Sequence, residues 1–276
     1  MPSTAIDSQI HGCMFSTDEM RRIWSDQSWA QKWLDTEAAL AKAQGELGVI
    51  PQEKAELINK YAKAELLDIP SIGEFYKSSI TIVPLLKAFK KVLPDNAGEF
   101  VHWGATSQDI VDTGMVLLQR DAYQVILRDM KACLGYCLDL AKKYNHTVMA
   151  GRTHVVHAIP ITFGYKAAVW ADELGRDIER IEAVAPRVFV GEMSGAVGTL
   201  ASQPEKGLET QKRMMEILGL GVPTIAWHVA RDSQAEFASV LALCAGTLGR
   251  INHEILSFPT QPDCACAASW MNRPCP

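Results

Sequence analysis

The stretch DTGMVLLQRDAYQVILRDMKACLGYCLDLAKKY, residues 112–144, decides the fold. Its apolar side chains recur at steps of three and four residues, the spacing that places them on one face of an α-helix. This stripe consists of Leu118, Ala122, Ile126, Met130, Cys133, Cys137 and Ala141. A helix of this length needs other helices to cover its apolar face, so the pattern predicts a bundle of long helices.

Two more long helices are expected later in the chain. One should run from Pro160, a residue suited to the first turn of a helix, to Pro186. The other should begin near Asp232, a residue type favoured at helix N-caps. Its apolar stripe comprises Phe237, Leu241, Cys244, Leu248, Ile251 and Ile255. No convincing alternation of apolar and polar residues marks a strand, so we expect an all-α fold.

The N-terminal part should form a small helical domain. Ser16 and Glu19 have the spacing of a capping box, which marks a helix start. A longer helix is expected over residues 28–47, and Gly48 should end it. Shorter helices joined by turns are expected over residues 51–95.

The expected organisation has three parts. Residues 1–111 form the N-terminal helical domain, and residues 112–258 form a partial long-helix bundle that is incomplete. Residues 259–276 form an atypical tail, which holds four prolines and three of the seven cysteines. Its Cys264 and Cys266 lack a partnering histidine or second cysteine pair, so we predict no metal or redox site there and interpret the tail as a truncated or altered C-terminus.

The composition is that of a globular protein, with 48% hydrophobic and 21% charged residues. The net charge of −5 gives no sign of the basic surface that nucleic-acid-binding proteins show. No segment approaches the ~20 consecutive apolar residues of a membrane helix, and no secretory signal is visible. We therefore expect a cytoplasmic protein without a nucleic-acid or membrane partner. Four cysteines should be reduced core thiols: Cys13, Cys133, Cys137 and Cys244.

Four polar, glycine-bearing segments adjoin the expected helix ends: residues 101–114, 151–164, 191–202 and 227–237. The start of a helix presents free backbone N–H groups and a positive dipole end, which favour a bound carboxylate. If the four segments converge, they form a site for an anionic ligand.

Two of these segments hold residues suited to carboxylate binding. In HWGATSQD, residues 102–109, Thr106 or Ser107 can cap the following helix and can also hold a substrate carboxylate. Asp109 is placed to interact with the helix dipole. In WHVARD, Arg231 can bind a carboxylate with two parallel hydrogen bonds, or it can form an ion pair with a neighbouring acidic residue.

The segment GRTHVVHAIPITFG, residues 151–164, places His154 and His157 three residues apart. No carboxylate or cysteine accompanies them and no HExxH pattern is present, so we expect no metal. Each imidazole can bond a nearby backbone carbonyl in a structural role. Each can also exchange protons near neutral pH as a general acid or base, and the residues alone leave both interpretations open.

Together, HWGATSQDIVDTG, GRTHVVHAIPITFGYKAAVW, SGAVGTLAS and WHVARDSQAEF resemble the fumarase/aspartase superfamily, most closely the branch with adenylosuccinate lyase and 3-carboxy-cis,cis-muconate cycloisomerase. The resemblance covers residues 13–257. It implies an all-α homotetramer without a cofactor, in which three subunits contribute to each active site. It also implies a small di- or tricarboxylate substrate and an anti β-elimination that releases fumarate from a succinyl compound, or the related cycloisomerisation.

The resemblance implies roles for individual residues. His154 matches the histidine that acts as the general acid or orients it. The implied substrate-binding residues are His102, Thr106, Ser107, Thr153, His157, Gln203 and Arg231, and Ser194 is a further implied contact.

Three departures from the family pattern bear on activity. GCMFSTDEM at residues 12–20 lacks the Arg-Tyr pair of adenylosuccinate lyases, and FYKSSITIVPLLKAF at residues 75–89 lacks their second catalytic histidine. Both absences favour a substrate smaller than a purine ribotide, while His154 stands where cycloisomerases often have tryptophan. The signature loop with the catalytic serine base is not found. We therefore expect an impaired lyase, inactive alone, or a noncatalytic fragment that pairs with full-length subunits.

Overall fold

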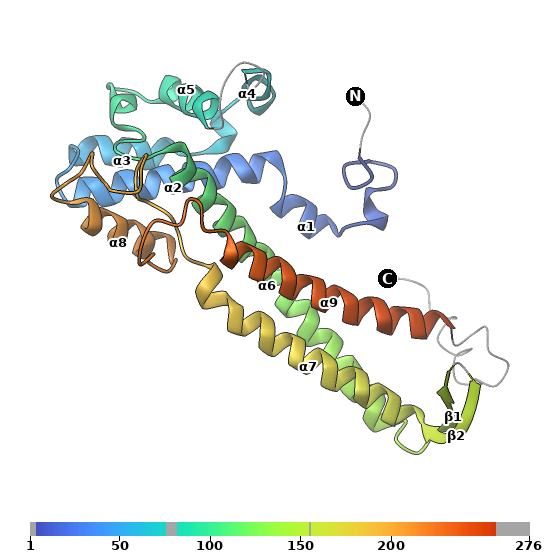
Figure 1. The fold of residues 1–276 in the computed structure, drawn as a ribbon. Helices are drawn as coiled ribbons and strands as arrows, with labels where there is room; N and C mark the ends of the chain where they lie inside the picture. The colour runs from blue at the N-terminus through green and yellow to red at the C-terminus, as the bar shows by residue number, and fades with distance from the viewer. Residues whose placement is uncertain (1–3, 76–81, 155, 258–276) are drawn as a thin grey trace. The chain divides into compact units, whose positions relative to one another are not determined.

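The computed structural model describes residues 4–75, 82–154 and 156–257, and helices dominate these residues (Figure 1). The α-helices are α1 (Asp18–Ile23), α2 (Asp26–Glu46), α3 (Gln52–Tyr61), α4 (Ile69–Phe75), α5 (Val83–Val92), α6 (Ser107–Lys143), α7 (Phe163–Val188), α8 (Gly207–Leu218) and α9 (Asp232–Ser257). Short 3-10 helices are η1 (Gly12–Met14), η2 (Ala64–Leu66) and η4 (Ala97–Phe100). The expected helical fold is confirmed.

One hairpin departs from the all-helical expectation. Strand β1 (Val148–Thr153) pairs in antiparallel fashion with β2 (Val156–Thr162). Pro160, expected in the first turn of a helix, lies within β2 instead, and α7 begins at Phe163. In a two-stranded sheet every strand is an edge strand, so a proline without an N–H group is tolerated. The Thr162 hydroxyl accepts the backbone N–H of Tyr165 at 3.1 Å and thereby caps α7.

Side-chain caps explain where other helices begin. The side chain of Thr17, rather than that of Ser16, accepts the N–H of Met20 at the start of α1. Helix α6 begins at Ser107, several residues before the start expected from its apolar stripe. Helix α9 begins at Asp232, as expected.

The chain divides into two compact units that interleave along the sequence. Unit 1 comprises Met1–Val125 and Pro186–Ser233. Unit 2 comprises Ile126–Ala185 and the segment that begins at Gln234. Helix α6 therefore starts in unit 1 and ends in unit 2.

The domain boundaries expected from the sequence stay predictions. The two compact units divide the chain at other positions. The proposed tail, residues 259–276, lies outside the described residues, and so do Cys264, Cys266 and Cys275. Among the cysteines that the structure describes, Cys137 and Cys244 are buried and Cys133 is partly buried. Cys13 is exposed, so its assignment to the core was wrong: it lies in the short helix η1, outside the packed helices.

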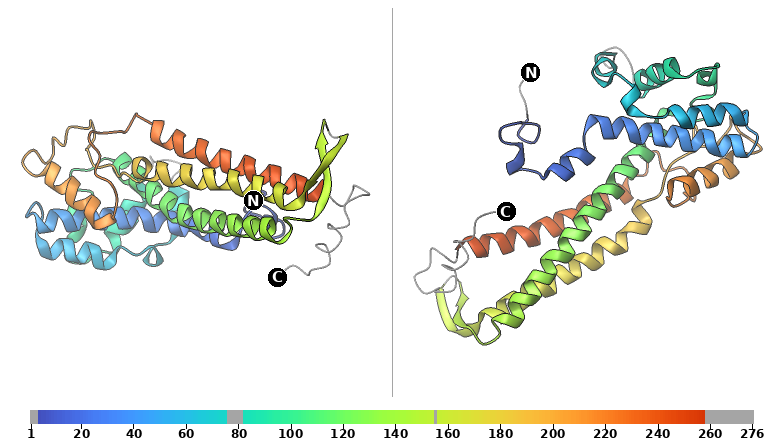
Figure 2. Two further views of the ribbon diagram at one scale, coloured as in Figure 1. Left: turned by 90° about the horizontal axis from the view of Figure 1, so that it is seen from below. Right: turned by 180° about the vertical axis from the view of Figure 1, so that it is seen from behind.

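Unit 1 is built around α2. Helices α3 and α8 pack against it, and all the views of the ribbon show them beside it (Figure 2). Eleven residues of α2 are buried, and most of them are alanine, glycine or leucine. Its largest fully buried side chains are Leu34 and Leu40, and Phe89 of α5 and Ile58 of α3 belong to the same core.

Unit 2 holds the long-helix bundle, in which the C-terminal part of α6 lies beside α7 and α9 (Figure 1). On α7 the apolar side chains Ala167, Trp170, Leu174, Ile178 and Ile181 are buried. On α9, however, Leu248 and Ile255 are 38% and 47% exposed and line a groove of about 810 Å³. Among the residues that the structure describes, no helix is long and apolar enough to cross a membrane.

Replacement of Leu34 with alanine should destabilise the protein, because Leu34 is fully buried in the core of unit 1. Its loss leaves a cavity, which we expect to lower the free energy of unfolding by about 2–5 kcal/mol. Urea denaturation followed by far-UV circular dichroism measures the change. The control is Leu208→Ala on α8, where the side chain is 73% exposed and the loss should be small. Equal effects of the two substitutions would contradict the assigned core.

Candidate active site

The start of α6 is organised by the carboxylate of Asp109, the third residue of the helix and 0% exposed. Its Oδ2 atom accepts the backbone N–H of Thr106 at 2.9 Å. A side chain that bonds back to the residue before the helix forms half of a capping box. Asp109 therefore does more than interact with the dipole: it fixes the turn that carries Thr106 and Ser107.

The same carboxylate holds the loop that precedes α8. Backbone N–H groups of Ser194 and Gly195 donate to Asp109 at 2.9 and 3.0 Å. Gly195 has φ +76°, a conformation that is strained for other residues. The Ser194 hydroxyl donates to Oε1 of Glu192 at 2.7 Å, so this predicted substrate contact is buried and engaged within the protein.

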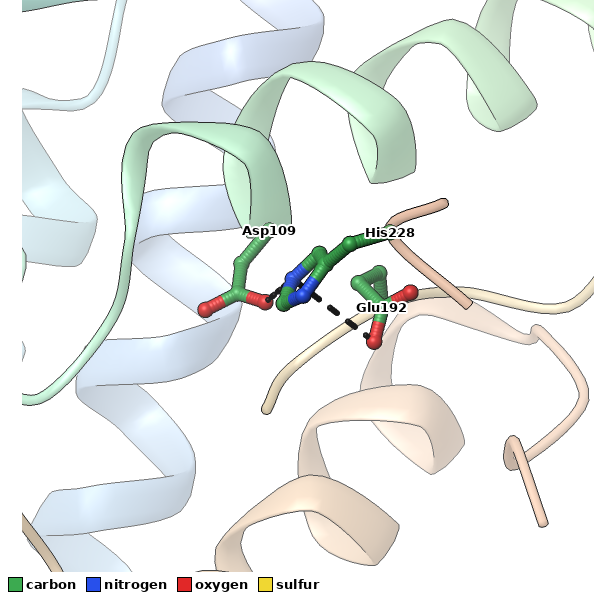
Figure 3. A group of neighbouring side chains, drawn as sticks. All are labelled: Asp109, Glu192 and His228. Atoms are coloured by element: carbon green, nitrogen blue, oxygen red, sulfur yellow. Dashed lines mark hydrogen bonds and ion pairs between the residues drawn. The ribbon is translucent and has the colours of Figure 1, made fainter. Parts of the chain in front are cut away.

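A histidine joins the two carboxylates (Figure 3). Nε2 of His228 lies 2.8 Å from Oδ1 of Asp109 and 3.9 Å from Oε1 of Glu192. The other Glu192 oxygen accepts the backbone N–H of Trp227 at 2.8 Å. Burial raises the pKa of the Glu192 carboxyl, against the lowering effect of its bonds from Ser194 and Trp227.

The ligand-type atoms of Asp109, Glu192 and His228 lie within 4.8 Å of one another, a spacing that metal ligands can have. All four carboxylate oxygens already accept hydrogen bonds from N–H or O–H groups of the protein. We therefore interpret these three residues as a hydrogen-bond centre that joins three chain segments, and call them the Asp109 cluster.

Two residues of α6 reinforce the Asp109 cluster. The Thr113 hydroxyl donates to the backbone carbonyl of Glu192 at 2.9 Å and accepts its N–H at 2.8 Å. The Gln108 amide donates to the carbonyl of His228 at 2.6 Å. Each bond spans 79 or more residues of sequence, so the first turns of α6 set the positions of both loops.

Arg231 lies at the edge of this arrangement. Its guanidinium donates to Oδ2 of Asp112 at 2.8 Å and to the carbonyl of His228 at 2.7 Å, and it lies over the Trp227 ring at 5.5 Å. The side chain is 41% exposed. A planar guanidinium held in this way retains N–H groups that can bind a carboxylate from solution.

His102 lies in the loop before α6, and Gln203 bonds to the same loop. The Gln203 amide donates to the carbonyl of Trp103 at 3.2 Å, and the Gln44 amide donates to the same oxygen at 2.7 Å. His102 places Nδ1 at 2.6 Å from Oε1 of Glu37, which lies on α2. The structure thus brings five predicted residues into one region of unit 1: His102, Thr106, Ser107, Gln203 and Arg231.

Three further predicted residues lie in unit 2. Thr153, His154 and His157 are exposed in the β1–β2 hairpin, where Thr153 pairs with Val156. His154 has φ +48°, as a residue in a tight turn requires. Their roles in acid catalysis and substrate binding stay predictions.

Sequence reasoning missed Glu37, Glu192 and His228 as parts of the site. Glu37 stands in an alanine-rich helix, and a buried charge there leaves no local pattern to recognise. His228 is next to Trp227 in the segment WHVARD, where the sequence predicted a ligand-binding role for Arg231 alone. A charged or ionisable residue in a buried position needs a partner, and that rule is the only signal the sequence held.

Replacement of Asp109 with alanine should be strongly destabilising. The substitution leaves three backbone N–H groups and the His228 ring without their acceptor, which we expect to lower the free energy of unfolding by about 3–5 kcal/mol. Urea denaturation measures the loss. The matched control on the same helix is Asp129→Ala, whose side chain is 56% exposed and whose removal should have little effect. Similar losses for both would contradict the role given to Asp109.

The sequence matches the lyase family over residues 13–269. It is 48% identical to N-acetyl-S-(2-succino)cysteine lyase from Enterococcus italicus, over 94% of this chain and 57% of that protein. It is 44% identical to adenylosuccinate lyase from Methanocaldococcus jannaschii, over 88% of this chain and 53% of that protein.

A solved structure shares the fold. The 3-carboxy-cis,cis-muconate lactonizing enzyme from Pseudomonas putida superimposes with a TM-score of 0.88 at 35% identity, over 92% of this chain and 59% of that one. The chain thus spans little more than half the length of these relatives. Its match to the family model and its identity to these proteins establish that the chain belongs to the lyase family of the fumarase/aspartase superfamily.

Proposed function

We propose that the protein binds a succinyl-substituted thiol or amine and serves the β-elimination that releases fumarate. The observation that carries this proposal is the 48% identity to an N-acetyl-S-(2-succino)cysteine lyase over 94% of this chain. The chain spans 57% of that relative, so the activity of the whole protein is part of the proposal.

The start of α6 supplies the carboxylate-binding side of the site. Thr106 and Ser107 stand where the helix presents its free N–H groups and positive end, and both side chains are partly exposed. Arg231 adds a positive charge, and His102 adds an ionisable ring. These groups suit the two carboxylates of a succinyl substituent.

In the proposed reaction, a base removes a proton from the carbon next to a substrate carboxylate. The electron pair is held on that carboxylate as an aci-carboxylate, and then forms the C=C bond of fumarate while the C–S or C–N bond breaks. A general acid protonates the leaving group, a role we propose for His154 with Thr153 and His157 beside it. Helix-end N–H groups and Arg231 stabilise the negative charge that develops on the carboxylate.

The thioether substrate is favoured over the purine nucleotide. N-acetyl-S-(2-succino)cysteine lyases from two organisms match at 48% and 43% identity, and the N-terminal stretch lacks an Arg-Tyr pair for a nucleotide. The second candidate is a 3-carboxy-cis,cis-muconate cycloisomerase-like activity, supported by the TM-score of 0.88. A third is a noncatalytic chain that pairs with full-length subunits.

We propose that the β1–β2 hairpin takes part in self-association. Val148, Val156 and Ile159 are 66–80% exposed there, and Tyr165 at the start of α7 is 62% exposed. A cluster of exposed apolar side chains marks an association surface. The family resemblance implies active sites shared between subunits, and His154 and His157 lie on this hairpin.

Replacement of Ser107 with alanine should weaken binding of fumarate and of N-acetyl-S-(2-succino)cysteine by about tenfold, because one hydroxyl donor to a charged carboxylate is lost. Isothermal titration calorimetry measures both affinities, and adenylosuccinate should bind wild type less tightly than the thioether. The control is Ser239→Ala on α9, which should leave both affinities unchanged. Absorbance of the fumarate formed from the thioether measures turnover. Conversion of carboxymuconate tests the cycloisomerase alternative. Unchanged affinity in Ser107→Ala would contradict the proposed carboxylate site.

Replacement of Ile159 with lysine should shift the protein toward smaller species. The side chain is 80% exposed, so the substitution does not disturb a core, yet it places a charge in the proposed interface. Analytical ultracentrifugation over a range of concentrations measures the association constant. Leu208→Lys, at a 73% exposed position on α8, is the control and should associate as wild type does. An unchanged association constant in Ile159→Lys would remove the hairpin from the interface.

A further inference from the structure

Glu37 is a buried carboxylate that the reaction described above does not use. It lies in the middle of α2, its side chain is 1% exposed, and its Oε1 lies 2.6 Å from Nδ1 of His102. The other oxygen, Oε2, has no hydrogen-bond partner within the described part of the chain. A buried carboxylate with a single partner is costly unless that partner carries a compensating charge.

The backbone at His102 is held in an uncommon conformation. Its φ is +67°, a region that few residues with side chains adopt. The next carbonyl, that of Trp103, accepts amide hydrogens from both Gln44 and Gln203. Such local strain persists when the surroundings determine it, and it recurs at functional sites. The loop therefore fixes the backbone of His102, and the bond from its Nδ1 to Glu37 orients the ring.

The charges that face His102 favour its protonated form. Burial alone lowers the pKa of the imidazole, but the hydrogen bond and the charge of Glu37 raise it, Asp109 adds to the rise and Lys90 opposes it. The net result is a pKa above the ordinary value. The second ring nitrogen, Nε2, makes no hydrogen bond with any residue that the structure describes, and the side chain is 18% exposed.

We propose that Glu37 is a positioning residue for substrate binding: it accepts the Nδ1–H of His102 and so leaves Nε2–H of the charged ring to bind a substrate carboxylate. This inference rests on the proposed function, in which His102 lines the carboxylate site. A neutral ring bonded to Glu37 through Nδ1–H would present a lone pair at Nε2 and would repel an anion. Glu37 thus determines that the His102 ring meets the substrate carboxylate with a positive charge.

The first test follows the His102 ring by ¹⁵N NMR during a pH titration. In wild type we expect His102 to titrate above 6.5, the ordinary value, and in Glu37→Gln its pKa should fall, because the charge of Glu37 that raises it is lost. Glutamine has nearly the same shape and keeps an acceptor oxygen, so the fold should persist. Glu46→Gln on the same helix, which removes an ion pair with Arg213, is the control and should leave His102 unchanged. Titration of wild-type His102 at or below 6.5 overturns the proposal without any variant.

The second test measures succinate binding by calorimetry. Because the pKa of His102 is raised, affinity should be full below pH 6.5 and should fall as pH rises through that raised pKa. Near neutral pH, Glu37→Gln should bind succinate about tenfold more weakly than wild type or Glu46→Gln. Equal binding by the two variants would overturn the inference and leave the proposed function standing. Failure of wild type to bind succinate would overturn the proposed function, and the inference with it.

Discussion

A carboxylate that is removed from water must find donors within the protein, and Asp109 finds four. Three are backbone N–H groups, from the turn before α6 and from the loop before α8, and the fourth is the ring of His228. Without this carboxylate the three segments lose the acceptor group that joins them. The position of Thr106 and Ser107, of Arg231 beside Asp112, and of the glycine turn at Gly195 all depend on it.

The proposed site therefore has two levels. Arg231 and the first turn of α6 are exposed or partly exposed and are proposed to meet the anion, while the buried acids Asp109, Glu192 and Glu37 bond to the groups around them. Negative charge close to a site for negative ligands would oppose binding if it stood alone. Here Asp109 and Glu192 bracket His228, Glu37 pairs with His102, and Asp112 pairs with Arg231, so each acid holds a neighbouring side chain in position.

Much of the fold could be predicted because long amphipathic helices leave a strong periodic signal, and α9 begins where its N-cap indicates. The hairpin could not, since Pro160 suits a helix start as well as an edge strand, and a two-stranded sheet leaves little pattern. For the candidate site, polar segments beside helix starts predicted roles for Thr106, Ser107 and Arg231. Glu37 and His228 could not be predicted, because their partners lie 65 and 119 residues away and no local sequence spacing indicates such pairs.

The contacts that form the site are also distant in sequence, from 79 to 120 residues apart for those that join α6 to the two loops. Closure of such long segments costs chain entropy before any contact can form, whereas each helix closes its own hydrogen bonds locally. During folding we expect the helices to form before these long-range contacts. We therefore expect an anion bound at the proposed site to slow unfolding more than it accelerates folding, because these contacts form late.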